Sequence, residues 1–366
     1  MVSVVLAGGG TAGHTSPLIA TAEQLCALDP DVRLQCVGTP KGLEKRVIPR
    51  AGLPLALIPA VPLPRKLNTD LLRLPARLTG AVNQARRIVK DAHADVVVGF
   101  GGYVSMPVYF AAFLSRVPVV IHEQNALPGI ANKVASRFAA AVLTSFPGTP
   151  LPDARQVGLP VRKAIAQLAE QGRDTRRSEA RERFGLREDQ PVLLVSGGSS
   201  GARSLNQATM AARDELLAQG IQVLHVIGAR DFDDDQPVTD GATGAGYHPL
   251  GYVDDMDLAY AAADLMLGRS GAGTVVETAV VGLPAILVPL PYGNGEQARN
   301  ATPLVDAGAA VLVPDDELDA ARLLAETIPL LTSPERLAAM SAAEQRVMPA
   351  GAAQRVASVV LEEARR

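Results

Sequence analysis

The stretch Gly8-Gly9-Gly10-Thr11-Ala12-Gly13-His14 decides the fold, because it places a glycine-rich turn where a strand gives way to a helix. The apolar run Val4-Val5-Leu6 before it is typical of a buried parallel strand. Ser16 and Pro17 form a good N-cap and first-turn pair, which predicts that His14 lies just outside the helix N-terminus. Glycines let a ligand approach the backbone and helix N-termini bind anions, so the pattern favours a diphosphate-containing ligand.

The same glycines, Gly8, Gly10 and Gly13, also match the G-x-G-x-x-G pattern of dinucleotide-binding folds. Those folds carry an acidic residue at the end of the second strand, where it binds the ribose of NAD. Here the second predicted strand, residues 32–37, continues into Gly38-Thr39-Pro40. A nicotinamide cofactor is therefore the less favoured interpretation.

Length and composition indicate two domains and argue against a nucleic-acid partner. The 366 residues, 48% of them hydrophobic, suffice for two buried cores. The net charge is −3 and aromatic residues make up 4%, which offers nucleic acid neither a basic surface nor stacking platforms. Cys26 and Cys36 are expected to be small buried hydrophobic residues in a reducing compartment. With no signal-peptide pattern and no 18-residue uncharged apolar window, the sequence predicts a cytosolic protein.

Apolar runs alternate with helical patterns in both halves of the chain. The first half predicts strands at 3–6, 32–37, 55–58, 96–99, 118–122 and 141–144, and the second at 192–195, 223–227, 265–267, 285–288 and 311–313. This rhythm predicts an α/β protein with two Rossmann-like, doubly wound parallel sheets facing across a cleft. The proline- and glycine-rich residues 146–160 are interpreted as the linker, and the aspartate-rich residues 231–240 as a mobile surface loop. A final helix is expected at 351–366.

Further glycine loops follow predicted strands at 101–105, 197–202 and 268–273. Parallel strands end at one edge of a sheet, so these loops are expected beside ligand crevices. In the last loop Arg269 is available to a phosphate. Thr274 and Glu277 fit a capping box, but a carboxylate one turn into that helix also suits a ribose diol, and both roles remain open.

Two short motifs resemble metal sites without meeting their requirements. His122-Glu123-Gln124-Asn125 lacks a second histidine at position 126, where zinc-binding helices carry one. Asp255-Met256-Asp257 resembles a metal-binding D-x-D, but it precedes a helical pattern and helix capping is favoured. No metal site is predicted.

The segment 65–90 is strongly basic within a net-negative chain. The segment contains several leucines and only one acidic residue, Asp70. Its seven basic residues are Arg65, Lys66, Arg73, Arg77, Arg86, Arg87 and Lys90. Such a surface suits anionic lipid headgroups. The alternative is a helix packed on the sheet with a solvated basic face.

Taken together, these motifs resemble the MurG family, peripheral membrane transferases that add N-acetylglucosamine (GlcNAc) to lipid I during peptidoglycan synthesis. The resemblance spans nearly the whole chain and is carried by residues 9–14, 101–105, 122–125, 158–162, 197–199 and 269–272, with Gln297 and Asn300. It implies the GT-B architecture. The N-terminal domain, 1–158, would receive the lipid acceptor and face the membrane, and domain 159–350 would bind UDP-GlcNAc. Helix 351–366 would pack back on the first domain.

The resemblance also implies residue roles. Glu277 would hold the ribose, Val253 would lie against uracil, and Glu296 with Gln297 would contact GlcNAc hydroxyls. The implied donor-binding residues are Thr11, Ala12, Gly13, His14, Asn125, Arg162, Ser199, Val253, Arg269, Ser270, Gly271, Ala272, Gly273, Thr274, Glu277, Glu296 and Gln297. The implied acceptor side is Gly10, Gly101, Gly102 and Tyr103. Ala12, Leu159, Ser200, Gly273 and Glu296 depart from the family pattern, and Glu296 matters most because a carboxylate cannot donate hydrogen bonds.

The implied reaction is an inverting transfer of GlcNAc to the C4 hydroxyl of the N-acetylmuramic acid (MurNAc) of lipid I, which gives lipid II. His14 is the candidate general base, or else an orienting group. No metal cofactor is required, although a divalent ion could assist without protein ligands. The implied partners are UDP-GlcNAc, lipid I, anionic lipid of the inner leaflet and other cell-wall enzymes, at the cytoplasmic face of the membrane. The alternative functions are those of a glycolipid transferase, a UDP-GlcNAc epimerase, a nicotinamide dehydrogenase and a non-catalytic nucleotide-sugar module.

Overall fold

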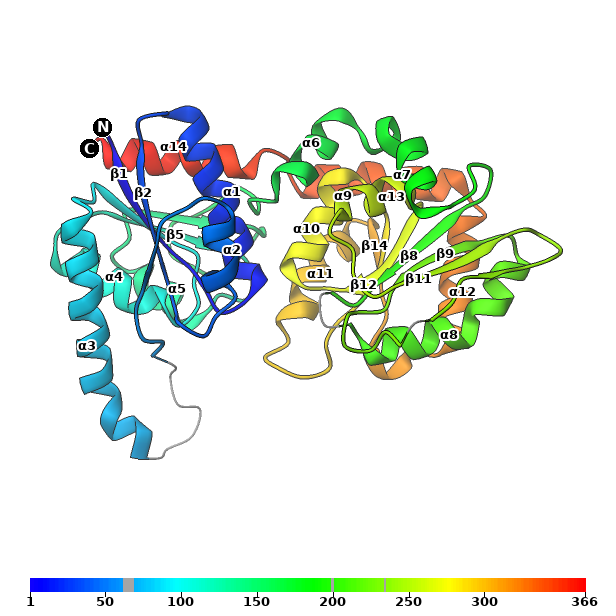
Figure 1. Ribbon diagram of the computed structural model, residues 1–366, viewed down its shortest axis with the longest axis horizontal. Coiled ribbons are helices and arrows are strands. Elements are labelled where there is room, and N and C mark those ends of the chain that lie inside the picture. Colours follow the sequence, from blue (N-terminus) through cyan, green and yellow to red (C-terminus); the bar gives the residue numbers. More distant parts are fainter. Residues whose placement is uncertain (62–68, 199–200, 234) are drawn as a thin grey trace. The chain divides into compact units, whose positions relative to one another are not determined.

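The computed structural model describes residues 1–61, 69–198, 201–233 and 235–366. The chain forms two compact units (Figure 1). The first unit comprises Met1–Arg162 together with Gly351–Arg366, and the second comprises Lys163–Ala350. Each unit is built around its own sheet.

The sheet of the first unit has the order β3-β2-β1-β4-β5-β6-β7, and all its described pairings are parallel. Its strands are β1 (Ser3–Ala7), β2 (Arg33–Gly38), β3 (Leu55–Leu57), β4 (Val96–Gly99), β5 (Val119–Glu123), β6 (Ala141–Thr144) and β7 (Ala154–Gln156). The six strands predicted in this half are all present. The linker interpretation of 146–160 is wrong in part, because β7 lies inside it. All three residues of β7 are exposed, so no apolar run marks the strand.

Helices cover both faces of this sheet. They are α1 (Ala12–Leu28), α2 (Glu44–Arg50), α3 (Thr69–Asp91), α4 (Ser105–Leu114), α5 (Ile130–Ala135) and α14 (Ala352–Ala364). Val4 and Leu6 of β1 pack in one cluster with residues of α1, α2 and α14. Val5 and Ala7 point to the other face and pack with residues of α3, α4 and α5. The last helix therefore belongs to the core of the first unit (Figure 1).

The second sheet has the order β10-β11-β9-β8-β12-β13-β14. Its strands are β8 (Val192–Ser196), β9 (Gln222–Val226), β10 (Val238–Thr239), β11 (Gly246–Leu250), β12 (Leu265–Arg269), β13 (Ala285–Val288) and β14 (Ala310–Leu312). Among the described pairings β10 is antiparallel to β11 and the others are parallel. The prediction of a loop over 231–240 is wrong where β10 lies. Sequence reasoning also missed β11, because Gly246 and Pro249 interrupt its apolar pattern.

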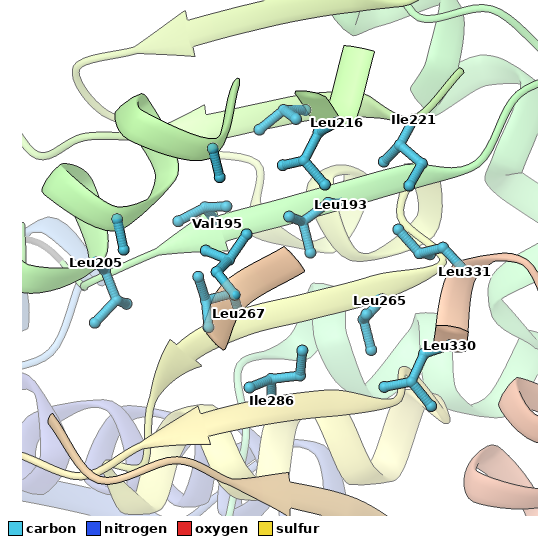
Figure 2. Close-up of a cluster of buried hydrophobic side chains, with 14 of the residues drawn as sticks. Leu193, Val195, Leu205, Leu216, Ile221, Leu265, Leu267, Ile286, Leu330 and Leu331 are labelled. Carbon is cyan, nitrogen blue, oxygen red and sulfur yellow. The ribbon is translucent and has the colours of Figure 1, made fainter. Parts of the chain in front are cut away.

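The helices of this unit are α6 (Lys163–Gln171), α7 (Arg177–Phe184), α8 (Arg203–Ala218), α9 (Met256–Ala262), α10 (Ala272–Val281), α11 (Glu296–Asp306), α12 (Ala320–Leu331) and α13 (Pro334–Val347). Short 3₁₀ turns occur at Arg173–Arg176 and Asp315–Glu317. Figure 2 shows leucines of β8 and β12 packed with Leu205 and Leu216 of α8 and Leu330 of α12. This apolar layer fixes the strand ends from which the loops of the candidate site emerge.

Helix α1 begins earlier than predicted, at Ala12 with Thr11 as the N-cap. His14 therefore lies in the first turn rather than outside the helix, and Pro17 lies inside it. Pro17 is tolerated because it leaves only one carbonyl, that of Gly13, without its helical partner. Cys26 is exposed, contrary to expectation, whereas Cys36 is buried.

Each sheet has one point at which the strand order reverses. In the first unit this point lies between β1 and β4, and in the second between β8 and β12. Open α/β sheets bind ligands beyond the strand ends at these points. The glycine loops after β1, β4, β8 and β12 therefore occupy the two candidate ligand crevices. No helix within the described ranges is both long and apolar enough to cross a membrane.

Candidate active site

The two glycine loops of the first unit pack directly on each other. Gly101 and Gly102 both have φ of +81°, and a Cβ at Gly102 would lie 2.5 Å from the carbonyl oxygen of Gly9. Ser105 Oγ donates to the carbonyl oxygens of Gly101 at 2.6 Å and Ala7 at 3.1 Å. This close approach needs glycine at both loops. The structure thus brings the predicted residues 10–14 and 101–103 together at one switch point.

His14 projects from the first turn of α1 beside these loops. Its Nδ1 lies 3.1 Å from Thr11 Oγ1. A Cβ at Gly101 would come within 3.3 Å of His14 Cδ2 and 3.5 Å of Asn132 Nδ2, so the missing side chain leaves room beside the ring. Burial lowers the pKa of His14, and the charge of Glu44 and the Gly9 carbonyl oppose the shift. The imidazole is therefore neutral at physiological pH, as a general base must be.

The remaining predicted residues of these loops lie at the surface. Thr11, Ala12 and Gly13 are exposed, and Tyr103 is 51% exposed. Their exposure makes the loops accessible to a large ligand.

Sequence reasoning missed Glu44, the first residue of α2. Its carboxylate accepts hydrogen bonds from the Gly10 N–H at 2.9 Å, the Thr39 N–H at 2.8 Å and Thr39 Oγ1 at 2.6 Å. The side chain is fully buried. Glu44 therefore ties the first glycine loop to the segment after β2. The available signal was its position, six residues after the strand end at Gly38 and directly after a glycine-containing turn.

The His122–Asn125 motif ends β5 and is mostly buried. His122 Nε2 lies 2.9 Å from the Gly158 carbonyl oxygen, and burial lowers the pKa of His122 to about 4. Glu123 accepts from the N–H groups of Asn125 and Gly129 at 3.0 Å and from Asn132 Nδ2 at 2.8 Å. Burial raises the pKa of Glu123 despite these bonds. The motif thus supports the loop that carries Asn125, a predicted donor-side residue.

In the second unit, α10 presents its N-terminus at the switch point. Gly271 is its N-cap, so Thr274 lies inside the helix and the capping-box alternative for Thr274 and Glu277 is wrong. The first-turn N–H groups, from Ala272 to Thr274, have no carbonyl partner within the helix. Ser270 precedes them, fully buried, and its Oγ has no hydrogen-bond partner among the described residues. These donors form a site suited to a diphosphate.

Glu277 lies one turn further along α10 and is partly buried. It accepts a hydrogen bond from Tyr260 Oη of α9 at 3.0 Å. The tyrosine therefore orients the carboxylate, a contact that sequence reasoning did not find because the two residues come from different helices.

Arg269 was expected to be available to a phosphate, but its guanidinium is already engaged. Nη1 pairs with Asp315 and also contacts the Val288 and Pro289 carbonyl oxygens, at 3.3 and 3.2 Å. Nη2 donates to Ser204 Oγ at 2.9 Å. With its side chain 13% exposed, Arg269 fixes the end of β12. Arg269 can therefore act on a phosphate through the electrostatic effect of its fixed positive charge.

Val253 lines a pocket of about 330 Å³ together with Tyr252, Arg183, Phe184 and His248. The pocket combines apolar walls with polar edges and follows the carboxyl end of β11. It has the character expected of a site for a planar base.

Glu296 and Gln297 begin α11. Gln297 Oε1 accepts from the Leu290 N–H at 3.0 Å, so the amide oxygen is committed and the NH₂ group remains as a donor. Asn300, one turn on, is buried, and its Nδ2 lies 3.4 Å from the Ser270 carbonyl oxygen. The start of α11 therefore offers a hydrogen-bond donor, the Gln297 NH₂ group, next to a hydrogen-bond acceptor, the Glu296 carboxylate.

The remaining predicted site residues and the Asp255–Asp257 motif lie in separate parts of the chain. Arg162 is exposed at the end of the first unit. Ser199 lies outside the described residues. Asp255 is the N-cap of α9, and Asp257 pairs with Arg176 at 2.6 Å. No group of three potential metal ligands occurs within the part of the chain that the structure describes.

Two Rossmann-like units, each with glycine loops at its switch point, define the GT-B class of glycosyltransferases. The model of the glycosyltransferase family 28 N-terminal domain matches residues 4–144, and that of the family 28 C-terminal domain matches residues 192–356. The chain belongs to glycosyltransferase family 28, and within it to the MurG transferases.

Individual relatives agree with this assignment over their full length. The chain is 59% identical to a Cutibacterium acnes protein named UDP-N-acetylglucosamine--N-acetylmuramyl-(pentapeptide) pyrophosphoryl-undecaprenol N-acetylglucosamine transferase, covering 100% of this chain and 98% of the relative. It is 54% identical to a Nocardioides protein of the same name, covering 98% and 97%. The crystal structure of Acinetobacter baumannii MurG superposes with a TM-score of 0.78 at 30% identity, covering 99% and 100%. The predicted GT-B fold and family are thereby confirmed.

Proposed function

We propose that this enzyme transfers GlcNAc from UDP-GlcNAc to the C4 hydroxyl of MurNAc in undecaprenyl-pyrophosphoryl-MurNAc-pentapeptide, lipid I, with inversion at the anomeric carbon. The product is lipid II. The full-length identity of 59% to a transferase named for these substrates carries the proposal. The acceptor would bind at the first unit and the donor at the second.

The donor half-site is assigned from the second unit. The diphosphate lies at the N-terminus of α10, Glu277 binds the ribose diol, and uracil enters the pocket beside Val253. Gln297 donates to a sugar hydroxyl through its amide, while Glu296 accepts from another. The Gln297 amide thus supplies the hydrogen-bond donor that the Glu296 carboxylate cannot provide.

The acceptor half-site is assigned from the glycine loops of the first unit. Gly10, Gly101, Gly102 and Tyr103 receive the MurNAc end of lipid I, and His14 removes the proton from its C4 hydroxyl. For Nε2 to act as the base, Nδ1 must carry the proton and donate to Thr11 Oγ1, which their 3.1 Å separation permits.

With the donor and acceptor substrates bound in this way, the transfer forms one bond and breaks one bond at the anomeric carbon. The acceptor oxygen bonds to the anomeric carbon of GlcNAc as the bond from that carbon to the UDP β-phosphate oxygen breaks, and UDP leaves with the electron pair. The N–H groups at the start of α10 stabilise the departing diphosphate. This arrangement does not require a protein-bound metal ion. Activity is accordingly expected to persist in EDTA.

Membrane association is assigned to the surface around α3. This helix extends beyond the rest of its unit (Figure 1) and exposes Arg77, Arg86, Arg87 and Lys90. Residues 65–68 of the predicted basic segment lie outside the described residues. Helix α4 packs on α3 and exposes Phe113 and Leu114, each at 55%. Adjacent basic and apolar groups favour the headgroup region of an anionic leaflet, here the cytoplasmic face of the cell membrane.

Vesicle sedimentation tests this assignment. The double variant Arg86→Gln/Arg87→Gln is expected to partition about tenfold or more less strongly to phosphatidylglycerol vesicles. The matched control Arg46→Gln/Arg50→Gln removes two exposed charges from α2, which packs on the other face of the sheet, and should retain wild-type partitioning. Equal losses in both double variants would refute a specific α3 surface, and strong binding to phosphatidylcholine would indicate an uncharged mode.

The reaction itself is tested by incubating the pure protein with labelled UDP-GlcNAc and a short-chain lipid I analogue. Acceptor-dependent appearance of the β-linked disaccharide is expected. Release of UDP or epimerised sugar without acceptor would instead favour the epimerase alternative.

A further inference from the structure

Glu44 combines complete burial with the absence, among the described residues, of any cation paired with it. Within the described residues, its oxygens accept hydrogen bonds from the Gly10 N–H, the Thr39 N–H and Thr39 Oγ1. Because these hydrogen bonds come from neutral groups, they hold the carboxylate without cancelling its charge. The charge can therefore act on ionisable groups nearby.

The surrounding chain is shaped to receive this carboxylate. A Cβ at Gly9 or at Gly42 would collide with the Glu44 carboxylate, and one at Gly38 would lie 2.5 Å from its Cγ. Three glycines from two loops thus enclose one side chain. Burial opposes ionisation of Glu44, but the hydrogen bonds from Thr39 and Gly10 outweigh it, so its pKa is lower than usual. Glu44 is negatively charged at neutral pH.

That negative charge acts on His14 and raises its pKa against the effect of burial. The other charged groups on α2 and just before it, Lys41, Lys45, Arg46 and Arg50, are exposed. From the opposite side, Glu123 reaches the region only through Asn132, which also accepts a hydrogen bond from the buried Tyr109 Oη at 2.7 Å. Glu44 is thus the charge placed to stabilise a protonated His14.

We propose that Glu44 is a positioning residue for glycosyl transfer, which holds the glycine loop through the Gly10 N–H and stabilises the His14 imidazolium. The proposal rests on the proposed function, with His14 as the base. As the acceptor oxygen bonds to the sugar carbon and UDP departs, the hydroxyl proton passes to His14 Nε2. The positive charge formed there is compensated by the carboxylate behind the loop.

The test compares Glu44→Gln, Glu44→Asp and the control Glu23→Gln, an exposed glutamate on α1, the helix that carries His14. In Glu44→Gln, kcat is expected to fall about tenfold or more at unchanged KM for UDP-GlcNAc. The acid limb of kcat/KM should move to lower pH by about half a unit, because loss of the negative charge lowers the pKa of His14. Glu44→Asp should keep the limb in place while kcat falls, and Glu23→Gln should match wild type.

A Glu44→Gln enzyme with wild-type kcat, or with reduced kcat and an unmoved limb, would overturn the proposal. If Glu44→Gln does not fold, Thr39→Ala removes the 2.6 Å bond and keeps the charge. It should lower kcat severalfold at unchanged KM, and wild-type kcat would count against the proposal. Titration of ¹³C-labelled His14 by NMR reports its pKa without activity. An inactive wild-type protein would therefore defeat the proposed function, whereas an unshifted His14 in Glu44→Gln would defeat this inference.

Discussion

At the scale of single residues, the candidate base is held by local contacts and tuned by burial. His14 contacts Thr11 in the same turn, and burial lowers its pKa below the ordinary value of 6.5. Its neighbours Gly9, Gly10 and Gly101 have no side chains that cover the ring. The environment thus keeps the imidazole neutral and accessible at neutral pH.

Replacing His14 by alanine should therefore lower turnover roughly a hundredfold or more, while the Kd for UDP-GlcNAc stays unchanged. In the proposed arrangement the contacts to UDP come from the second unit, so loss of the imidazole at the reacting centre removes none of them. Radiolabel transfer and isothermal titration calorimetry measure the two quantities. His93→Asn, which alters an exposed histidine just after α3, is the control, and equal turnover in the two variants would reject the base role.

A second residue-scale prediction concerns Glu344 on α13, which is fully buried and whose two carboxylate oxygens have no hydrogen-bond partner within the described ranges. Burial raises its pKa well above the ordinary 4.5, although the charge of Arg173 opposes this. A raised carboxyl pKa favours folding below the ordinary pKa, and this contribution is lost as pH rises through the folded value.

Glu344→Gln should accordingly unfold with a free energy higher than wild type by roughly 1 kcal/mol or more at pH 8. The difference should vanish near pH 4.5. Urea unfolding at both pH values provides the measurement. A variant less stable than wild type at pH 8 would mean that Glu344 and Arg173 form a net stabilising ion pair.

At the scale of elements, α14 matters most, because it completes the core of a unit whose other elements lie some 190 residues or more earlier in the sequence. Val356 and Val360 pack with Leu18 and Leu25 of α1 in one buried cluster. Arg355 donates two hydrogen bonds, at 3.0 and 2.7 Å, to the carbonyl oxygen of Val157 near the end of the same unit.

Truncation of Val360 to alanine should therefore destabilise the first unit by about 2 kcal/mol, the sum of lost apolar burial and a small cavity. Ser358→Ala, an exposed change on the same helix, should have little effect. Chemical denaturation followed by circular dichroism measures both. Equal stability of the two variants would show that α14 contributes little to the core.

The success of sequence reasoning differed between elements for physical reasons. Strands buried on both faces, such as β1 and β8, appear as continuous apolar runs and were found. The exposed β7 and the proline-containing β11 carry no such run. The start of α1 was misplaced because Pro17 suggested a first turn, whereas the helix accepts it further in.

In the candidate site, too, sequence reasoning found some features and missed others. Glycine loops and the start of α10 are local patterns and could be located. Partners such as Glu44, Tyr260 and Asp315 come from distant segments, and only the fold reveals that they contact Gly10, Glu277 and Arg269.

At the scale of the whole molecule, each unit has its own hydrophobic core, and the groups proposed to bind UDP itself lie in the second unit. A ligand that binds only one folded unit stabilises that unit by mass action. UDP at a hundredfold excess over its Kd should add about 2.7 kcal/mol to the second unit. Calorimetry is expected to show one transition raised by UDP and another lowered by Val360→Ala. A single transition that responds to both would indicate that the units unfold together.

The return of α14 to the first unit also has a consequence during synthesis. The ribosome makes most of the first unit first, yet its final helix is made only after the whole second unit. The amino-terminal half must therefore wait, incompletely packed, while the half translated after it can already fold. Polypeptides that end before Gly351 should accordingly be degraded rather than accumulate, because their first unit cannot complete its core.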